Sequence, residues 1–531
     1  MRNLIIILIF IHVIYLFPFF KQGIPLSHDG DGHVARIGAY YKAFTDGQFP
    51  PRWAGDLNFG FGTPLFIFNY HLPYYFSTFF HLIGLSLVDS FKLVLGISFI
   101  LSGVGFFLWL SKLLSKEAAF LGGLLYGLAP YHFLNIFVRG AYGETVALAI
   151  IPFIFWQIEK IINKNKLLDV FIAGILYGLL ILTHNGMSIM FSPIFILYCL
   201  FRKRNKYHLK SFLIFFLIGI LISAYFWLPA VVESKYVGGD YNIWEIYKEH
   251  FPPFLKLIYS QWGFGPSVNS TDGLSSQIGI ILFFFVFIGI INFLKDKEKF
   301  VGFWLLIFFS AIFLTTSLSN VVWSNIMFLR FLEFPWRFTA LSTLAGAVVG
   351  AYVISKIKDK KMIYLIVIVL FITSFFYTKT NVQNNRGDKY YYSFAGSTVY
   401  RRATSTIWSG GDPFEIPKNK IEIISGKGKI NNLLVRSNLH SFNLFAESDV
   451  AVLDNTFYFP GWKVEVNKKK VPIEFQDVNN RGLITFNVSE GHRKVEIIFK
   501  ETLVRTVANT ISLVSVLLLF FIFIYRKKYK V

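Results

Sequence analysis

Long apolar stretches alternate with short basic clusters along most of this chain. The apolar stretches are long enough to cross a bilayer as helices, and we expect about twelve spans. They are 4–20, 90–111, 117–136, 143–160, 167–183, 187–201, 211–228, 277–294, 300–317, 337–355, 362–377 and 504–525. Basic loops of membrane proteins face the cytoplasm, and this threading places every basic cluster there. The pattern therefore predicts a multi-pass protein of the cell membrane with both termini in the cytoplasm.

The first external loop, 21–89, contains a further apolar segment at 64–88. Counting that segment as a span would invert the orientation of every later basic cluster. Its prolines and aromatic residues favour a re-entrant or interfacial segment instead. The aromatic run at 70–75 fits packing at the membrane interface better than a platform for sugar stacking.

A polar region between the last two spans differs from the rest of the chain. Residues 378–503 alternate apolar and polar positions between Gly, Asn and Asp turns, which is typical of strands. The predicted fold is an all-α polytopic membrane domain over 1–377, with an extracytoplasmic β-sandwich-like domain over 378–503. Residues 504–531 would form the last transmembrane helix and a basic cytoplasmic tail.

Composition supports a membrane protein and excludes several other classes. Charged residues are 16% of the 531, against about 25% in soluble domains. Mean hydropathy is +0.53, which excludes an ordinary soluble or disordered chain. The single cysteine excludes a disulfide framework and a thiolate zinc cluster. The net charge of +21 sits in short clusters between apolar runs, so it indicates cytoplasmic loops and not nucleic-acid binding.

Polar motifs from five separate stretches fall on the external side of this threading, at the ends of spans. They are HDGDGH (28–33), RGAYGE (139–144), THN (183–185), the stretch around Glu233, and EFPWRF (333–338). Ionisable groups near or within a membrane are functional candidates by default. The sequence therefore predicts that these motifs share one layer at the outer face.

The HDGDGH motif carries the densest set of candidate catalytic groups. A helix that follows it would place Asp29 and His33 one turn apart, with Arg36 next on that face. An external carboxylate beside imidazoles such as His28 can act as a general base or bind a divalent cation. Asp29 with Asp31 would be the ligands of such a cation. An Asp-rich turn and helix cap explains the same residues equally well.

The other motifs supply candidate substrate-binding residues. Arg139 could hold a phosphate through its fork of donors, and Glu144 could orient it or contact a sugar hydroxyl. A glutamate in a first helical turn also simply complements the helix dipole, which is the more common role. His184, Glu233 and Arg337 carry the same two interpretations, as ligand contacts or as polar groups at span ends.

Three segments resemble a known family. SHDGDGHVARI, DGQFPPRWAGDLNFGFGTPLFIFNYHLPYY and LYGLAPYHFLNIFVRGAYGETVALAIIPF resemble bacterial and archaeal membrane proteins called 6-pyruvoyl-tetrahydropterin synthase-related, which are relatives of the YfhO-like proteins. The resemblance covers 20–160 well and continues more loosely through THNG, FPWRF and FPGWKVEVNKKKV. Pterin chemistry is not expected, because nothing here supplies a three-histidine zinc site on a soluble fold.

Both groups look like members of the GT-C glycosyltransferase superfamily. That resemblance implies many helices, a catalytic Asp in the first external loop and a lipid-phosphate sugar donor. The family pattern HD-x-x-x-H falls on His28, Asp29 and His33, and R-G-A-x-x-E falls on Arg139 and Glu144. Asp31 is not a usual family position, which weakens the case for a paired-carboxylate metal motif.

The expected activity is therefore an inverting sugar transfer outside the membrane. A polyprenyl-phosphate sugar would be the donor, and an envelope glycan, glycolipid or protein the acceptor. Asp29 would be the general base, assisted by His33, and Arg139 with Arg337 would stabilise the phosphate. Mg or Mn is the cofactor that the motif permits, and no nucleotide, haem, zinc or nucleic acid is expected.

Two other classes of function remain open. A lipid-linked glycan flippase or transporter would need polar groups through the midplane, whereas the unusual charges here gather at one face. A non-catalytic envelope-assembly protein would tolerate substitution of Asp29 and Arg139.

Overall fold

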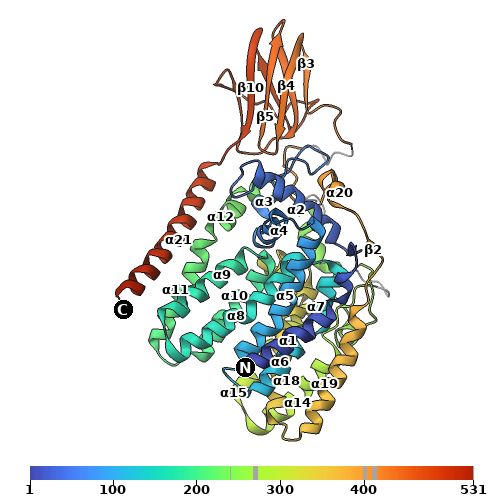
Figure 1. Cartoon of the computed structure of the whole chain (residues 1–531), viewed down its shortest axis with the longest axis vertical. Helices are drawn as coiled ribbons and strands as arrows, with labels where there is room; N and C mark the ends of the chain where they lie inside the picture. Colours follow the sequence, from blue (N-terminus) through green and yellow to red (C-terminus); the bar gives the residue numbers. More distant parts are fainter. Residues whose placement is uncertain (239–240, 267–272, 399–402, 410–414, 530–531) are drawn as a thin grey trace.

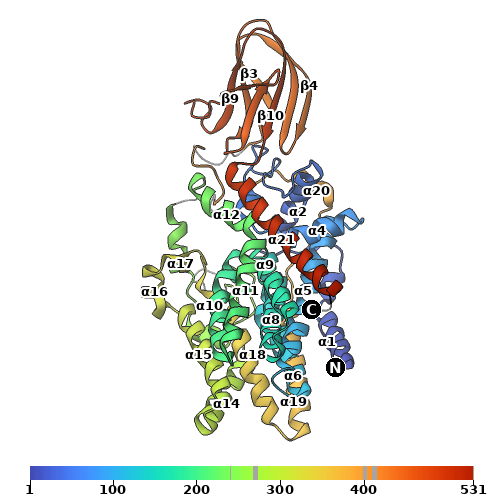
Figure 2. The ribbon, with the colours of Figure 1, turned by 90° about the vertical axis from the view of Figure 1, so that its left-hand side faces the viewer.

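A computed structural model describes residues 1–238, 241–266, 273–398, 403–409 and 415–529 of the chain. A bundle of helices carries a β domain at one end, and the last helix runs back from that domain along the bundle (Figures 1 and 2). The longer helices are α1 (Arg2–Tyr15), α2 (Gly30–Thr45), α4 (Leu72–Leu82), α5 (Leu87–Leu110), α6 (Lys116–Gly127), α8 (Tyr142–Lys164), α9 (Leu167–Ile181), α10 (Asn185–Arg202), α11 (Lys206–Ile222), α12 (Ala224–Glu233), α14 (Ile280–Asp296), α15 (Lys299–Thr315), α18 (Thr339–Lys356), α19 (Lys360–Phe375) and α21 (Leu503–Tyr529).

Short helical turns connect these helices. They are η1 (Phe17–Phe20), α3 (Leu65–Phe68), α7 (Pro130–Phe133), η2 (Leu134–Arg139), η3 (Ser234–Tyr236), η4 (Tyr241–Glu249), α13 (Phe254–Ile258), η5 (Ser317–Ser319), α16 (Asn320–Asn325), α17 (Met327–Arg330), η6 (Pro335–Phe338), η7 (Phe376–Thr378) and α20 (Asp388–Tyr392).

Each predicted span falls on a helix or on a pair of helices. Within the described ranges, six helices are long and apolar enough to cross a membrane, or up to nine if each bent pair is one span. The bent pairs are α6 with α7 and η2, α11 with α12 and η3, and α15 with η5 and α16. Helices α1 and α9 are shorter apolar helices. A multi-pass helical architecture is thus confirmed, while the number of crossings and the cytoplasmic termini stay predictions.

The segment 64–88 is broken into two helices. Helix α4 has 11 residues, so it is about 16 Å long and too short for a hydrocarbon core of about 30 Å. It packs on α5 and α2 at the end of the bundle nearest the β domain (Figure 1). Helix α4 is therefore too short to cross a membrane by itself, and the re-entrant or interfacial placement of 64–88 stays a prediction.

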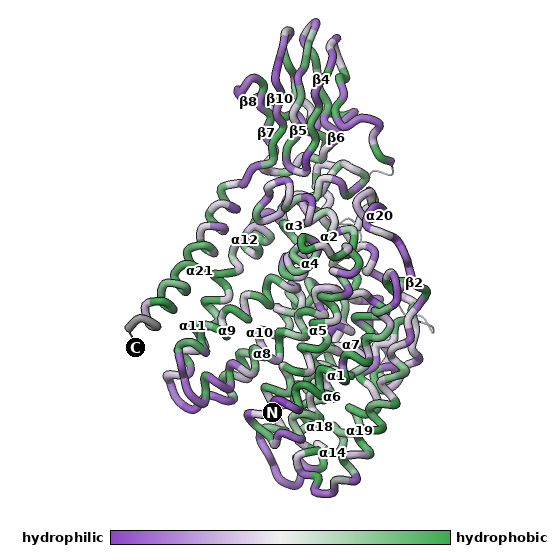
Figure 3. Tube along the Cα trace, viewed as in Figure 1, coloured by the Kyte–Doolittle hydropathy of each residue, from purple (hydrophilic) through white to green (hydrophobic). Residues whose placement is uncertain are grey.

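The centre of the bundle depends on small residues. Helix α18 is buried on all sides, as expected for a helix that is apolar all round. An added Cβ at Gly350 would lie 2.8 Å from Leu125, and one at Gly122 would lie 2.8 Å from Ala351. Helices α19 and α21 instead expose apolar side chains, and Figure 3 shows α21 as a largely hydrophobic helix at the edge of the bundle.

The β domain consists of two antiparallel sheets. One has the order β4 (Gly428–Arg436), β5 (Leu439–Ala446), β10 (Gly491–Phe499), β7 (Trp462–Val466) and β8 (Lys469–Val471), and the other β3 (Ile421–Ser425), β6 (Val450–Phe457) and β9 (Leu483–Val488). Inward side chains of both sheets, including Phe442, Val452 and Phe486, form one core. The expected β-sandwich is confirmed, and its place outside the membrane stays a prediction.

The boundary expected at residue 378 is wrong for the sandwich itself, which begins at β3. Within 378–420, β2 (Gln383–Asn384) pairs with β1 (Ile24–Pro25) of the first loop, whereas Trp408 packs on Tyr458 and Phe475 of the β domain. The hydropathy pattern indicated a polar region over 378–503. It could not show that the beginning of this region packs on the first external loop.

The first external loop also joins the β domain to the bundle. Trp53 inserts into the β core, and its ring lies edge-on to Trp462 at 5.5 Å between centroids. At the start of α21, Arg505 Nε donates to Glu233 Oε2 at 2.9 Å and Arg505 Nη2 donates to the Pro460 carbonyl at 2.7 Å. The β domain therefore has its own core and also packs against the helical bundle.

A buried carboxylate in the β core predicts a pH-dependent stability. Asp454 Oδ2 lies 2.6 Å from His440 Nδ1, and Oδ1 accepts from Thr456 at 2.7 Å. Burial opposes ionisation, but His440 and Lys420 outweigh it and hold the pKa of Asp454 below its usual range. A lowered pKa stabilises the fold above the unfolded value of about 3.9, and this stability is lost as pH falls through the lower native pKa.

We expect Asp454→Asn to destabilise the β domain by about 2 kcal/mol at neutral pH. The deficit relative to wild type should shrink as pH falls from about 4 toward the lower native pKa of Asp454, because the unfolded carboxylate and then the native one become protonated. Hydrogen exchange of the β5 and β6 amides in the full-length protein measures this. Asp449→Asn, in an exposed turn, should show no such pH-dependent difference. A deficit of unchanged size at pH 2 would contradict this assignment.

Candidate functional site

Asp29 lies at the N-terminus of α2, and its carboxylate makes no hydrogen bond or ion pair with the described residues. Its backbone N–H donates to the Arg139 carbonyl at 2.8 Å, and the His28 N–H donates to the Val138 carbonyl at 3.0 Å. The side chain occupies the cap position but makes no capping hydrogen bond, and it is exposed. Within the described part of the chain it forms no ion pair either. The cap interpretation therefore fails for this side chain, and the carboxylate is available to a ligand.

Gly140 permits the close approach between the two motifs. Its φ is +65°, a left-handed conformation that favours glycine. An added Cβ would lie 2.8 Å from the Gly30 nitrogen and 2.6 Å from Ser27 Oγ. The RGA motif thus holds the HDG motif against it by backbone contacts, which places Asp29 directly beside Arg139 in the structure.

Glu144 is the centre of a buried charged cluster at the start of α8. The carboxylate is 1% exposed. Arg139 donates to both of its oxygens, at 2.7 and 2.9 Å, and Arg337 Nε donates to Oε1 at 2.9 Å. The Tyr131 hydroxyl donates to Oε2 at 2.9 Å. One carboxylate therefore orients two guanidinium groups from distant parts of the chain.

The two arginines keep donors that Glu144 does not use. Trp336 lies under the Arg139 guanidinium at 4.4 Å, and Phe334 lies under that of Arg337 at 4.7 Å. Among the residues that the structure describes, Arg139 Nε and Arg337 Nη2 donate to no hydrogen-bond acceptor. Planar guanidiniums held in this way are suited to binding a phosphate or carboxylate.

His184 joins the cluster from the turn before α10. Its Nδ1 accepts from the Met187 N–H at 3.1 Å, so the ring proton is on Nε2, which lies 3.9 Å from Glu144 Oε1. Burial lowers the pKa of His184 to about 3, so the ring is neutral at physiological pH. Its ring centroid is 5.5 Å from that of Tyr70. His184 is therefore a helix cap beside the Glu144 cluster, and its contact with a substrate stays a prediction.

His33 and Arg36 lie on the same helix as Asp29 but are already engaged. His33 is buried, with Nδ1 2.8 Å from the Tyr74 hydroxyl. Burial lowers its pKa, and the positive charges of Arg36 and Arg139 lower it further. Arg36 donates to the Thr398 side chain at 3.1 Å and to its carbonyl. We infer that both residues position the N-terminus of α2, and a direct catalytic role of His33 stays a prediction.

Asp31 and His28 face away from the Glu144 cluster toward other segments. The Asp31 carboxylate accepts from Asn384 at 2.7 and 2.8 Å, from Tyr391 at 2.7 Å and from Arg386 at 3.3 Å. His28 Nε2 lies 3.0 Å from the Phe264 carbonyl. The described residues contain no group of three or more His, Cys, Asp and Glu side chains that could hold a metal ion. The cation ligands Asp29 and Asp31 stay a prediction, and Asp31 already has protein partners.

Glu233 is the predicted site residue that the structure places elsewhere. Its carboxylate is buried against Arg505 and accepts from Thr502 at 2.8 Å. Its partners therefore lie at the start of α21 and in the residue before it, so Glu233 anchors the beginning of the last helix. Sequence reasoning also misses Tyr131 and Asn135, which contact Glu144 and Arg139. The one available signal is that polar residues precede Arg139 at helical spacing inside an apolar stretch.

Three solved structures share a general likeness with this chain. Arabinofuranosyltransferase AftD from Mycobacteria is 13% identical and has a TM-score of 0.46, covering 71% of this chain and 26% of its own. The Archaeoglobus fulgidus oligosaccharyltransferase is 14% identical and has a TM-score of 0.49. The match covers 78% of this chain and 61% of the oligosaccharyltransferase. ArnT from Cupriavidus metallidurans, bound to undecaprenyl phosphate, is 10% identical and has a TM-score of 0.31. The match covers 65% of this chain and 77% of ArnT. All three likenesses are weak.

Sequence comparison is more specific. A protein of Lactococcus lactis subsp. cremoris (strain MG1363), described as uncharacterized, is 26% identical over 357 residues. The match covers 62% of this chain and 54% of the relative, so the chain spans about half the length of that protein. A family model described as the 6-pyruvoyl-tetrahydropterin synthase related domain of membrane proteins matches residues 68–382, which include Arg139, Glu144, His184 and Arg337. This match spans more than half of the sequence, and the chain belongs to that family of membrane proteins.

Proposed function

We propose that this protein is a membrane glycosyltransferase that moves a sugar from a polyprenyl-phosphate donor to an acceptor hydroxyl on the outer side of the membrane. The observation that carries the proposal is the uncommitted Asp29 carboxylate held by backbone contacts beside Arg139. A backbone hydrogen bond thus joins the residue proposed as the base to a residue that can bind an anion.

The chemistry divides between these two groups. Asp29 takes the proton of the acceptor hydroxyl as its oxygen attacks the anomeric carbon. The bond between that carbon and the phosphate oxygen breaks, and the polyprenyl phosphate leaves with the bonding electron pair. Arg139 and Arg337 stabilise the charge that develops on the phosphate, using donors that Glu144 leaves unused. The new glycosidic bond has the inverted configuration because the attack comes from the opposite face.

Glu144 is a positioning residue in this scheme. It neutralises part of the charge of the arginine pair and fixes the plane of each guanidinium. His184, neutral and adjacent to Glu144, limits the access of water to this buried carboxylate. A divalent cation held at Asp29 would add positive charge beside the donor phosphate.

A direct assay tests the proposal. Full-length protein is reconstituted into liposomes that contain a polyprenyl-phosphate-linked hexose with a labelled sugar. Formation of a new glycoside with release of polyprenyl phosphate supports the proposal. Movement of intact labelled lipid between leaflets, without any bond change, would support a flippase and overturn it. A divalent chelator added to the same assay tests the predicted cation.

The contact at Gly140 gives a further prediction for this activity. Gly140→Ala should lower the transfer rate by about tenfold or more, because the added methyl group pushes residues 27–30 away from Arg139. Gly84→Ala is the matched control, since Gly84 also has a positive φ, of +102°, but has no atom within 4 Å of an added Cβ. Equal loss of transfer in both variants would show that backbone strain alone is responsible.

A further inference from the structure

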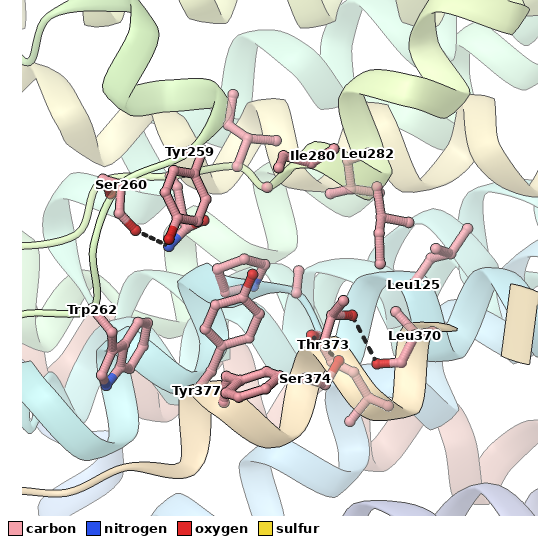
Figure 4. Close-up of a pocket in the computed structure, with 18 of the residues that line it drawn as sticks. Leu125, Tyr259, Ser260, Trp262, Ile280, Leu282, Leu370, Thr373, Ser374 and Tyr377 are labelled. Carbon is pink, nitrogen blue, oxygen red and sulfur yellow. Dashed lines mark hydrogen bonds between the residues drawn. The ribbon is translucent and has the colours of Figure 1, made fainter. Parts of the chain in front are cut away.

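A pocket of about 450 Å³ lies between α6, α7, α14 and α19. Figure 4 shows Tyr259 on one side of it and Trp262 and Tyr377 on the other, with Leu125, Leu282 and Leu370 at one end. Its size is within the usual range for small-molecule sites, about 300–1,000 Å³. The walls are mainly apolar, so the pocket suits a ligand with a substantial hydrocarbon part.

Two apolar side chains that line the pocket lie at the outer surface of the bundle. Ile280 and Phe376 line the pocket and are 57% and 58% exposed. They belong to α14 and to the turn after α19, and α19 exposes most of its apolar side chains. In a membrane protein such a surface faces lipid tails. A hydrocarbon chain can therefore enter this pocket from the bilayer without passing through water.

The other end of the pocket carries an unpaired acceptor. Gln277 is 2% exposed, and its Nε2 donates to the Ser260 carbonyl and to Ser275 Oγ, both at 2.8 Å. Its Oε1 is buried and has no hydrogen-bond partner among the described residues. Buried acceptors are rarely left unpaired, because desolvation without a partner is costly. An O–H or N–H group of a ligand would satisfy this oxygen.

The charge of the lining argues against a phosphate at this end. Of the described residues that line the pocket, Lys379 alone is charged, and it is exposed. A buried phosphate needs charge-assisted donors, and these are at Arg139 and Arg337 instead. A neutral head group with hydroxyls fits an amide acceptor better than an anionic one.

The walls of the pocket continue into the candidate site. Pro130 lines the pocket, and the next residue, Tyr131, donates to Glu144. Trp262 also lines it, and two residues later the Phe264 carbonyl contacts His28, the neighbour of Asp29. The lining of the pocket is thus continuous along the chain with a residue that contacts Glu144 and with a carbonyl that contacts the neighbour of Asp29.

We propose that this pocket binds the acceptor, and that the acceptor is a membrane lipid with an uncharged head group that carries several hydroxyls, such as a glycosyl diacylglycerol. Its acyl chain lies against α14 and α19, and one hydroxyl donates to Gln277 Oε1. A second hydroxyl faces Asp29 and attacks the donor sugar, while its proton moves to Asp29 and polyprenyl phosphate departs. This assignment rests on the proposed function and adds to it the chemical class of the acceptor.

Photolabelling of the full-length protein in liposomes tests the pocket without requiring turnover. The probe is monoglucosyl diacylglycerol with a diazirine in one acyl chain. We expect label on the pocket-lining parts of α14 and α19. Gln277→Met should carry about tenfold less label, because the lipid loses its hydrogen bond to Oε1 and the segment 260–277 loses the two bonds of Nε2. Thr373→Phe, which fills the pocket from α19, should lower the labelling in the same way.

Gln157→Met is the matched control. Gln157 is also 2% exposed and its Oε1 is also unpaired among the described residues, but it lies in α8 away from the pocket lining. Labelling should be unchanged in this variant. Phosphatidylcholine with the same diazirine, which has no head-group hydroxyl, should label these helices weakly. Equal labelling by the two lipids, or no effect of either pocket variant, would overturn the acceptor assignment.

Two further experiments distinguish failure of the acceptor assignment from failure of the proposed function. Excess methyl glucoside should not compete with the lipid probe, and competition would show that the pocket takes a free sugar. Asp29→Asn should keep full labelling while it loses transfer. If the wild-type protein is labelled specifically but transfers sugar from no donor, the proposed function is contradicted. The pocket would then still be a lipid-binding site.

Discussion

Asp29→Asn should lower the rate of sugar transfer by about a hundredfold or more, because the amide cannot accept the proton of the acceptor hydroxyl. The fold should be unaffected, since no described residue depends on this carboxylate for a hydrogen bond or an ion pair. The measurement is the initial rate in liposomes with a polyprenyl-phosphate-linked labelled hexose, together with the midpoint of thermal unfolding. Wild-type turnover in a folded Asp29→Asn protein would end the assignment of the base.

Asp31→Asn is the matched control, two residues away in the same motif. Its carboxylate accepts from Asn384, Tyr391 and Arg386, so the substitution should cost about 1–2 kcal/mol of stability. Transfer by the folded variant should stay within about threefold of wild type, since Asp31 is turned toward its protein partners. If both variants stay folded and both lose transfer, a cation held by the two carboxylates explains the site better than a single base.

Glu144→Gln should destabilise the protein by about 3–5 kcal/mol, because it leaves two buried guanidiniums without their shared counter-charge. The amide keeps the shape of the side chain, so the loss reports charge and hydrogen bonding and not a cavity. Thermal or denaturant unfolding in a fixed lipid or detergent mixture measures the difference. The transfer rate of any folded fraction should also fall, because Arg139 and Arg337 lose their orientation.

Glu333→Gln separates this effect from a general loss of negative charge near Arg337. Glu333 Oε2 accepts from Arg337 at 3.0 Å, but its side chain is 38% exposed. An ion pair of that exposure is screened by solvent, so its loss should cost less than about 1 kcal/mol. Equal destabilisation by the two substitutions would mean that the buried cluster is not the stabilising element that its geometry indicates.

Much of the architecture could be predicted because the relevant patterns are local. Runs of apolar residues mark the helices of the bundle, and alternation of apolar and polar positions marks strands such as β5 and β9. The choice not to count 64–88 as a span came from the basic clusters and agrees with the short helix α4. These inferences succeed because burial in lipid or in a sheet core acts on each segment separately.

Pairing between distant charges could not be predicted in the same way. The sequence places Glu144, Glu233, Arg337 and Arg505 at or near the ends of spans, and nothing in their spacing tells which charge meets which. Glu144 binds Arg139 and Arg337, whereas Glu233 binds Arg505. The contact of Asp31 with Asn384 likewise depends on how the segment after α19 folds back on the first loop.

Hydropathy and charge along the chain were enough to predict a polytopic helical protein with a terminal β domain and a layer of polar motifs at one face. They could not show that the Asp29 carboxylate has no partner among the described residues while Asp31, His33 and Arg36 are engaged. Nor could they reveal a pocket lined by Gln277, whose Oε1 is unpaired in the same part of the chain. The reason is physical: the partition of a segment between water, lipid and a sheet depends on its own composition, whereas the partner of a side chain depends on which distant segments the packed fold brings within about 3 Å of it.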